Sequence, residues 1–224
     1  MEKAEVIREM ERYRLVAVVR SKSSEEALQT VKAVVEAGVR FVEITMSVPG
    51  ALGLVKELAN EEGFCVGAGT VLAKKEAEQA IKNGARFIVS PTLELDLIPI
   101  CREAGVTVVS GAATPTEVLT AIRAQADMVK IFPADCLGGP HFLRQIAAAL
   151  PKTRFMVSGG VNRSNVKEYI QIGVIGLALG SAFLADLLAR QGHSGLVNEV
   201  RQFVKLVEEA VSGQLSVPVL GSER

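Results

Sequence analysis

Short apolar runs alternate with longer amphipathic patterns along the whole sequence, and this alternation limits the possible folds more than any other feature. The runs start about every 20–27 residues, and each is apolar on both faces, as parallel strands covered on both sides must be. We expect strands at Leu15–Val19, Arg40–Thr45, Cys65–Gly69, Phe87–Ser90, Val106–Ser110, Met128–Phe132, Phe155–Val157 and Gly176–Gly180. Eight strand–helix units in succession predict an α/β fold, a (β/α)8 TIM barrel.

Start and stop signals of helices lie between these runs. Thr114 is a candidate N-cap with Pro115 at the first helical position, and Ser23 precedes a segment with acidic residues in its first turn. Four glycines stand where a helix would end just before a strand: Gly38, Gly84, Gly105 and Gly173.

The sequence indicates a single barrel domain over residues 1–224, because no Ser-, Gly- or Pro-rich tract interrupts the series. The leading segment 3–13 is amphipathic, and we expect it to form a helix that caps the N-terminal mouth of the barrel. The tail 212–224 has little periodicity and is expected to be peripheral. An open Rossmann-like sheet would need a glycine-rich turn after its first strand, whereas residues 20–24 contain no glycine.

The charge balance excludes some classes of partner. Lys and Arg together number 25, and so do Asp and Glu. Binding to a nucleic-acid backbone needs an excess of positive charge, so we expect no nucleic-acid partner. The apolar runs are far shorter than the ~20 residues of a membrane span, and the charged N-terminus lacks the apolar segment of a signal peptide. These features predict a cytoplasmic protein that does not bind membranes.

Cysteine and histidine offer little for metal or triad chemistry. Cys65, Cys101 and Cys136 are widely spaced, and we interpret them as small buried hydrophobes in a reducing compartment. The two histidines, His141 and His193, lie far apart, which disfavours a zinc site or a Ser-His-Asp triad. We therefore expect no metal, and chemistry that rests on Lys, Glu, Arg and the backbone.

Lys130 is the most informative residue, because it lies inside an otherwise apolar strand. By alternation it shares a face with Met128 and Phe132, opposite Val129 and Ile131. Burial of an unpaired ammonium is costly, which favours the neutral amine. A neutral amine in a dry pocket can form a Schiff base with a carbonyl group. The alternative is a structural lysine in a buried ion pair.

Glu43 is the expected partner of Lys130. It lies mid-strand on a face shared with Phe41 and Thr45, and a buried carboxylate there needs a charge or a hydrogen-bond partner. If both side chains point into the barrel, they can meet near its top. A simple salt bridge explains the two charges equally well, but it does not explain the glycines around them.

Polar and glycine residues gather where nearly every strand ends, and active sites of barrels lie at that end. The segments 158–162 and 180–181 follow the last two strands, where many barrels bind phosphate through backbone N–H groups. Arg20 can serve an anion, and Thr70 can donate a hydrogen bond to a carboxylate or carbonyl group.

Eight short motifs resemble those of the 2-keto-3-deoxy-6-phosphogluconate (KDPG) aldolase / 4-hydroxy-2-oxoglutarate (KHG) aldolase family. They occur in order over about residues 13–190: V-V-R at 18–20, E-I-T at 43–45, G-A-G-T-V-L at 67–72, S-P at 90–91, T-P-T-E at 114–117, K-I-F-P-A at 130–134, S-G-G-V-N at 158–162 and G-S at 180–181.

The resemblance implies a homotrimeric class I aldolase of barrel fold that works without a metal or other cofactor. It implies that Lys130 forms the Schiff base, that Glu43 moves protons and that Phe132 packs beside the lysine. The remaining implied substrate-binding residues line the pyruvate end or the phosphate end: Arg20, Thr70 and Pro91 at the first, and Ser158, Gly159, Gly160, Gly180 and Ser181 at the second.

Four places depart from the family pattern. One is Ser110-Gly111, where many members read P-G. Ser47 stands where many members have arginine, Ser158 where many have threonine, and Thr92 where glycine or histidine is usual. These departures leave open whether the substrate is a gluconate, a galactonate or the glyoxylate-derived aldol. Two other functions also stay open on the residues alone: a phosphosugar isomerase or epimerase on the same barrel, and a non-catalytic barrel that binds a phosphorylated metabolite.

Overall fold

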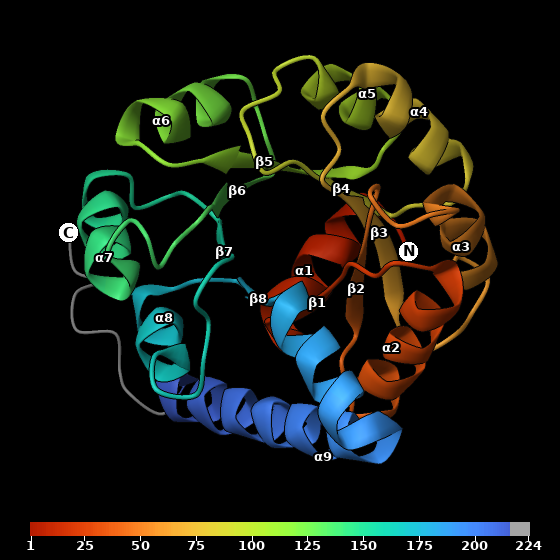
Figure 1. Cartoon of the computed structure of the whole chain (residues 1–224). Coiled ribbons are helices and arrows are strands. Elements are labelled where there is room, and N and C mark those ends of the chain that lie inside the picture. Colours follow the sequence, from red (N-terminus) through yellow and green to blue (C-terminus); the bar gives the residue numbers. More distant parts are fainter. Residues whose placement is uncertain (216–224) are drawn as a thin grey trace.

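The chain forms a closed barrel of parallel strands surrounded by helices. The structure, a computed structural model, describes residues 1–215, and in that range each strand pairs with the next while the eighth pairs with the first. Figure 1 looks along the barrel, with the strands at the centre and helices around them. The strands are β1 (Leu15–Val19), β2 (Phe41–Thr45), β3 (Cys65–Gly69), β4 (Phe87–Val89), β5 (Thr107–Ala112), β6 (Met128–Ile131), β7 (Phe155–Val157) and β8 (Gly176–Leu179).

The helices begin and end close to the signals in the sequence. Ser23 and Thr114 are N-caps whose side chains accept from the backbone N–H three residues on. The four expected helix-ending glycines all have positive φ. The helices are α1 (Lys3–Tyr13), α2 (Ser24–Glu36), α3 (Ala51–Leu58), α4 (Lys74–Lys82), α5 (Leu97–Glu103), α6 (Pro115–Arg123), α7 (Gly139–Ala149), α8 (Val166–Ile172) and α9 (Ser181–Leu215).

Several expected boundaries differ by one or two residues. The expected strand at Val106–Ser110 is in fact Thr107–Ala112, because pairing of Ala112 with Ile131 carries it further. The expected tail also starts too early, since residues 212–215 continue α9. Residues 216–224 of that tail lie outside the described residues.

The core has an inner and an outer layer. The outer layer fills the space between strands and helices, and the inner layer fills the barrel. Val6 and Met10 of α1 belong to the inner layer together with Val16 and Phe41 of the strands. Helix α1 therefore caps the barrel as expected, and it crosses the centre of the ring in Figure 1.

The same two layers fix the direction of Lys130. Met128 lies in the inner layer, whereas Val129 and Ile131 lie in the outer one. Since side chains of a strand alternate, Lys130 points into the barrel, as the alternation predicts. Phe41 is inside and both Val42 and Ile44 are outside, so Glu43 points inward as well.

The interpretation of the cysteines as buried is right for two of the three. Cys65 and Cys101 are buried, and burial raises the pKa of each thiol to about 12. Cys136 is exposed, so its interpretation as a buried hydrophobe was wrong. It follows β6 in a loop that the alternation of the strands does not reach.

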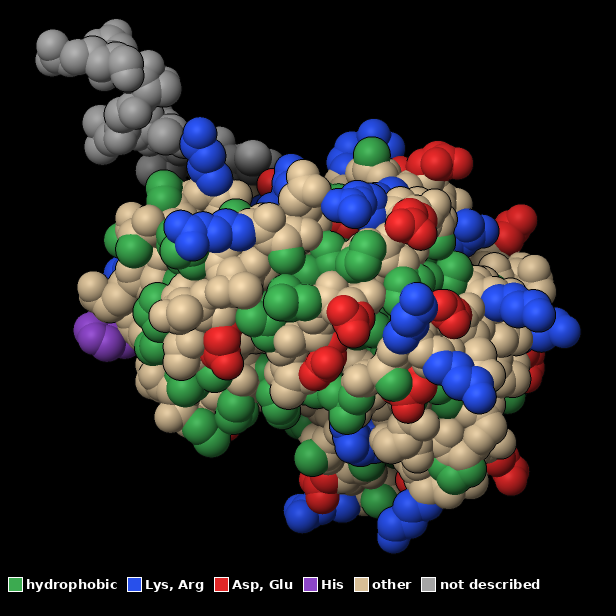
Figure 2. Space-filling view, turned by 90° about the horizontal axis from the view of Figure 1, so that it is seen from above, with side chains coloured by type: hydrophobic (Ala, Val, Ile, Leu, Met, Phe, Trp, Pro, Cys, Tyr) green, Lys and Arg blue, Asp and Glu red, His purple; other side chains and the backbone are tan. Residues whose placement is uncertain are grey.

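The surface carries both signs of charge. Figure 2 shows acidic and basic side chains interspersed on one face, in keeping with the balanced composition. Among residues 1–215, no helix has the length and apolar character to cross a membrane.

Candidate active site

A cavity of about 600 Å³ opens at the C-terminal ends of the strands. Residues from seven βα units reach it, and all the substrate-binding and catalytic residues expected from the sequence line it. These are Arg20, Glu43, Thr70, Pro91, Lys130, Phe132, Ser158, Gly159, Gly160, Gly180 and Ser181. Four lining residues were not foreseen, namely Val18, Val161, Ala182 and Phe183. They carry no polar side chain, so only their place beside the foreseen residues could have pointed to them.

Lys130 and Glu43 meet at the floor of this cavity. The Lys130 Nζ lies 3.7 Å from Glu43 Oε1, and the two side chains are only 5% and 1% exposed. Strands β2 and β6 lie across the barrel from one another, so the closed sheet brings the pair together. Among the described residues, neither carboxylate oxygen of Glu43 accepts a hydrogen bond. A buried carboxylate normally accepts several. The pair is therefore an ion pair without a hydrogen bond, and both oxygens of Glu43 remain available as acceptors for a substrate or a bridging water.

Glycines make room for Glu43. A Cβ added at Gly69 would overlap the Glu43 carboxylate, and one added at Gly67 would collide with the Phe87 ring. A Cβ at Gly111 would overlap the backbone of Pro91 and Thr92. The side chains at these positions are excluded by close packing rather than by positive φ. Of the three, only Gly69 borders Glu43, and its lack of a side chain leaves the space that the carboxylate occupies.

Arg20 and Thr70 form a polar edge of the cavity. The Arg20 Nη2 donates to Thr70 Oγ1 at 3.0 Å. Thr70 has a φ of 54°, which a β-branched residue rarely adopts. Backbone strain of this kind clusters at functional sites. The bond holds the guanidinium over the cavity, where its other N–H groups can meet a carboxylate.

Phe132 forms an apolar wall beside the lysine. Its ring centroid is 5.5 Å from Lys130 Nζ, and its side chain is 38% exposed. Pro91 lies on another side of the cavity. Phe132 therefore gives the cavity an apolar surface next to the amine.

The other end of the cavity is built from backbone. Gly159 and Gly160 have φ of 97° and 69°, which favour glycine. Ser181 begins α9, so the first N–H groups of that helix face the same cavity from Gly180 onward. Free N–H groups at a helix N-terminus suit an anion. This end can therefore hold a phosphate without a basic side chain.

Three of the departures, at Ser158, Ser47 and Thr92, fall in different places. Ser158 is 7% exposed and lines the cavity. Ser47 is exposed outside it, and its Oγ lies 3.0 Å from Thr45 Oγ1. The Thr92 hydroxyl donates to Glu94 Oε1 at 2.9 Å. Only Ser158 can contact a substrate in this cavity directly.

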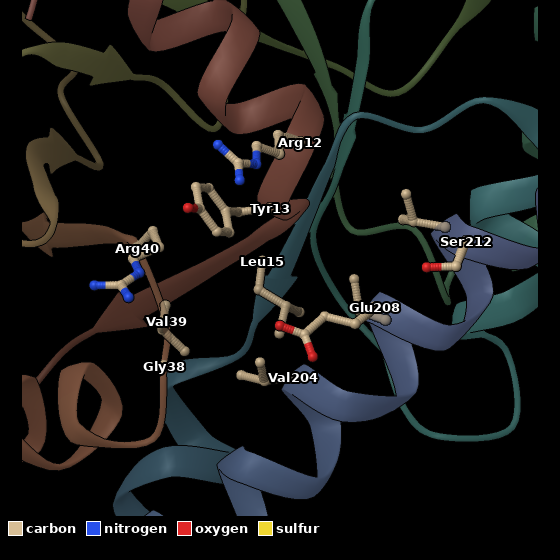
Figure 3. A pocket seen from close by; sticks show the side chains of 11 residues that line it. Arg12, Tyr13, Leu15, Gly38, Val39, Arg40, Val204, Glu208 and Ser212 are labelled. Carbon is tan, nitrogen blue, oxygen red and sulfur yellow. The ribbon is translucent and has the colours of Figure 1, made fainter. Parts of the chain in front are cut away.

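Another cavity, of about 210 Å³, lies at the opposite end of the barrel. Figure 3 shows Tyr13 between Arg12 and Arg40, with Glu208 of α9 nearby. The two guanidinium carbons lie 5.1 and 5.9 Å from the Tyr13 ring centroid. Residues at this end of a barrel serve stability, whereas catalytic residues lie at the C-terminal ends of the strands.

Metal ligands do not cluster in the described part of the chain. Among residues 1–215, no group of three or more His, Cys, Asp or Glu side chains is placed to hold a metal ion.

The family described as KDPG and KHG aldolase matches residues 6–200. The chain belongs to the KDPG/KHG aldolase family. It is an aldolase, a carbon–carbon lyase.

Named relatives cover nearly the whole of this KDPG/KHG aldolase. The 2-dehydro-3-deoxy-6-phosphogalactonate aldolase of Escherichia coli (strain K12) is 34% identical over 201 residues, 88% of this chain and 96% of the relative. The KHG/KDPG aldolase of the same strain is 30% identical over 200 residues, 89% of this chain and 91% of the relative.

A solved structure of a similar protein contains a covalent reaction intermediate. A KDPG aldolase from Legionella pneumophila, with pyruvate captured at low pH as a covalent carbinolamine intermediate, has a TM-score of 0.78. It is 25% identical, and the match covers 87% of this chain and 95% of that one.

Proposed function

We propose that this aldolase reversibly cleaves a 2-keto-3-deoxy-6-phospho sugar acid to pyruvate and glyceraldehyde 3-phosphate, or KHG to pyruvate and glyoxylate. The observation that carries the proposal is the free carboxylate of Glu43, 3.7 Å from a buried lysine and facing the cavity. A structural pair would use its acceptors within the protein. This feature also speaks against the non-catalytic barrel left open by the sequence.

Lys130 supplies the nucleophile. Its neutral amine attacks the C2 ketone, forming a carbinolamine that loses water to give an iminium. The Glu43 carboxylate, 3.7 Å from Nζ, accepts the proton that the ammonium must first lose, directly or through one water. It then gives this proton to the carbinolamine hydroxyl, which leaves as water, so Glu43 is a carboxylate again before the cleavage step. The iminium nitrogen then serves as the electron sink for cleavage.

Glu43 moves the protons of the cleavage step. It takes the proton of the C4 hydroxyl, directly or through one water. The C3–C4 bond breaks, its electrons form an enamine with the iminium, and C4 leaves as an aldehyde. The protonated Glu43 returns its proton to C3, and water hydrolyses the iminium to free pyruvate and Lys130.

The two ends of the cavity orient the substrate for this step. Arg20, with Thr70, faces the carboxylate of the pyruvate half, and Pro91 and Phe132 pack against its methylene. The backbone of Gly159 and Gly160, with Ser158 behind it, holds the phosphate from one side. Gly180 and Ser181 hold it from the other. Binding energy from the remote phosphate then contributes to orienting C3 and C4.

The test is pyruvate release from three candidate aldols: KDPG, its galactonate epimer and KHG. We expect the wild-type protein to release pyruvate from at least one of them and Lys130→Arg to release none, because a guanidinium stays protonated. A circular dichroism spectrum shared by the two proteins serves as the folding control. Turnover by Lys130→Arg at the wild-type rate would contradict the assignment of the nucleophile.

We further propose that the enzyme works as a cytoplasmic homotrimer, as the family resemblance implies. The chain has a mass of 23.8 kDa, and sedimentation equilibrium should give three times that value. A mass of one chain at micromolar concentration would contradict the trimer.

A further inference from the structure

The segment that follows β7 holds one backbone carbonyl unusually firmly. The Gly160 carbonyl oxygen accepts from Asn162 Nδ2 at 2.9 Å and from Asn165 Nδ2 at 2.8 Å. Two side-chain donors thus converge on a single acceptor in an exposed turn. Neither asparagine lines the cavity, so direct contact with a substrate does not explain them.

The two asparagines are themselves fixed. Asn162 Oδ1 accepts from the Ser164 N–H and hydroxyl at 2.9 and 2.6 Å. Asn165 Oδ1 accepts from the Asn162 N–H at 2.9 Å. Each amide therefore uses its oxygen within the segment and keeps its nitrogen for Gly160. The Gly160 carbonyl therefore accepts from two donors whose own side chains are held in place by hydrogen bonds.

The opposite side of the turn is also packed. A Cβ at Gly160 would overlap Asp135, and one at Gly159 would lie 2.9 Å from Asp135 Oδ1. The Ser158 carbonyl accepts from the Ala134 N–H at 2.9 Å. The turn is therefore held between Asp135 on one side and the asparagines on the other.

The two hydrogen bonds from Asn162 and Asn165 to the Gly160 carbonyl, called the Gly160 clamp below, determine the direction of the Val161 N–H. A trans peptide is planar, so the Val161 N–H points opposite to the Gly160 carbonyl. Val161 lines the cavity. Within the described residues, the N–H groups of 159, 160 and 161 donate to no protein acceptor. The carbonyl is turned outward, and the donors are left for a ligand.

We propose that Asn162 and Asn165 are positioning residues that aim the Val161 N–H at the substrate phosphate. The inference rests on the proposed function and deepens it, since it assigns the phosphate end of the cavity to a clamp on Gly160. Without the clamp, the 160–161 peptide can rotate and present a carbonyl oxygen to the anion. An oxygen in place of a donor repels phosphate.

The test compares Asn162→Ala, Asn165→Ala and the double variant with wild type on two substrates. KDPG carries the phosphate, and 2-keto-3-deoxygluconate is the same sugar acid without it. Asn60→Ala is the matched control, because this exposed asparagine also donates its Nδ2 to a backbone carbonyl, that of Lys56, and does not line the cavity. Inorganic phosphate serves as a competitive inhibitor that probes the site without chemistry.

Each single variant should lose about fivefold to tenfold in kcat/KM on KDPG, the usual effect of one hydrogen bond. The loss should reside in KM, inhibition by phosphate should weaken in parallel, and kcat/KM on the unphosphorylated acid should stay within about twofold, the scale of a neutral substitution. Asn60→Ala should behave as wild type on both. This pattern supports the clamp.

Two outcomes overturn the inference and leave the proposed function intact. One is an equal loss on both substrates, which makes the asparagines merely structural. The other is no loss in the double variant while Ser181→Ala still weakens phosphate inhibition. If wild type neither prefers KDPG nor is inhibited by phosphate, the phosphate end of the proposed function fails, and the clamp fails with it.

Discussion

At the scale of single residues, the proposed chemistry depends on two inward-facing charges. Strand alternation alone predicted the direction of Lys130 and Glu43, because both stand among apolar residues of known periodicity. It could not predict the 3.7 Å separation or the free carboxylate oxygens, since both depend on how β2 and β6 face each other across the closed barrel. The exposure of Cys136 was missed because it lies in a loop without periodicity.

Replacing Glu43 by Gln keeps the size of the side chain and removes the base. We expect kcat to fall ~10²–10⁴-fold, the usual range for loss of general acid–base catalysis. Formation of the pyruvate adduct should be affected less than cleavage. Steady-state kinetics and adduct mass spectra measure the two separately. Cleavage at close to the wild-type rate would assign the base to another group.

Gly69→Ala tests the clearance around Glu43. The new Cβ overlaps the carboxylate, so Glu43 must move away from Lys130. Because general acid–base catalysis depends on this position, kcat should fall ~10²-fold or more. Gly53→Ala is the matched control, since a Cβ there meets nothing within 4 Å and lies in helix α3. Equal kcat values for the two variants would show that the position of Glu43 is unimportant.

At the scale of elements, local signals predicted starts better than ends. Thr114 and Pro115 set the start of α6, and the structure has a full capping box there, with Glu117 reaching back to the N-cap. Strand ends were less accurate, since the last paired residue depends on the neighbouring strand, as Ala112 opposite Ile131 shows. The sequence also could not predict that Gly111 packs against the Pro91 backbone, because this contact joins segments from two different strand–helix units.

Thr114→Ala should lower the free energy of unfolding by about 1 kcal/mol at pH 7, the typical effect of losing an N-cap. Thr116→Ala, the same change two residues along, should cost less than about 0.5 kcal/mol as an exposed substitution. Urea denaturation measures both. Equal effects would mean that the cap does not stabilise α6.

The same variant should show a pH dependence through Glu117. Hydrogen bonds from the Ala113 N–H, the Thr114 hydroxyl and the Thr114 N–H lower the pKa of Glu117. A lowered carboxyl pKa contributes stability above the unfolded value of ~4.3, and that contribution is lost as pH falls through the folded pKa. Thr114→Ala removes one of these donors. The difference in free energy of unfolding between wild type and Thr114→Ala should therefore become smaller as the pH falls below ~4.3.

At the scale of the whole molecule, the barrel brings residues that are far apart in the sequence into one cavity. The repeated strand–helix units predicted the fold, and the fold then placed eleven expected residues around a single cavity. The phosphate end could be predicted only as glycine-rich loops, because its donors are backbone groups whose direction depends on Asn162 and Asn165.

The chemistry of this cavity predicts independence from metal ions. The iminium on Lys130 absorbs the electrons that a bound metal ion would absorb in a metal-dependent aldolase. Pyruvate release should therefore persist at the same rate after exhaustive treatment with EDTA. Loss of activity on chelation, with recovery on adding zinc or manganese, would favour the metal-dependent epimerase type of site.

The most direct measurement of the central claim is borohydride reduction in the presence of pyruvate, followed by peptide mass mapping. We expect one covalent adduct per chain, on Lys130, because its buried amine beside Glu43 is the proposed nucleophile. Lys130→Arg should give no adduct, and Glu43→Gln should still give one. The absence of an adduct in wild type, or an adduct on an exposed lysine such as Lys74, would contradict the Schiff-base mechanism.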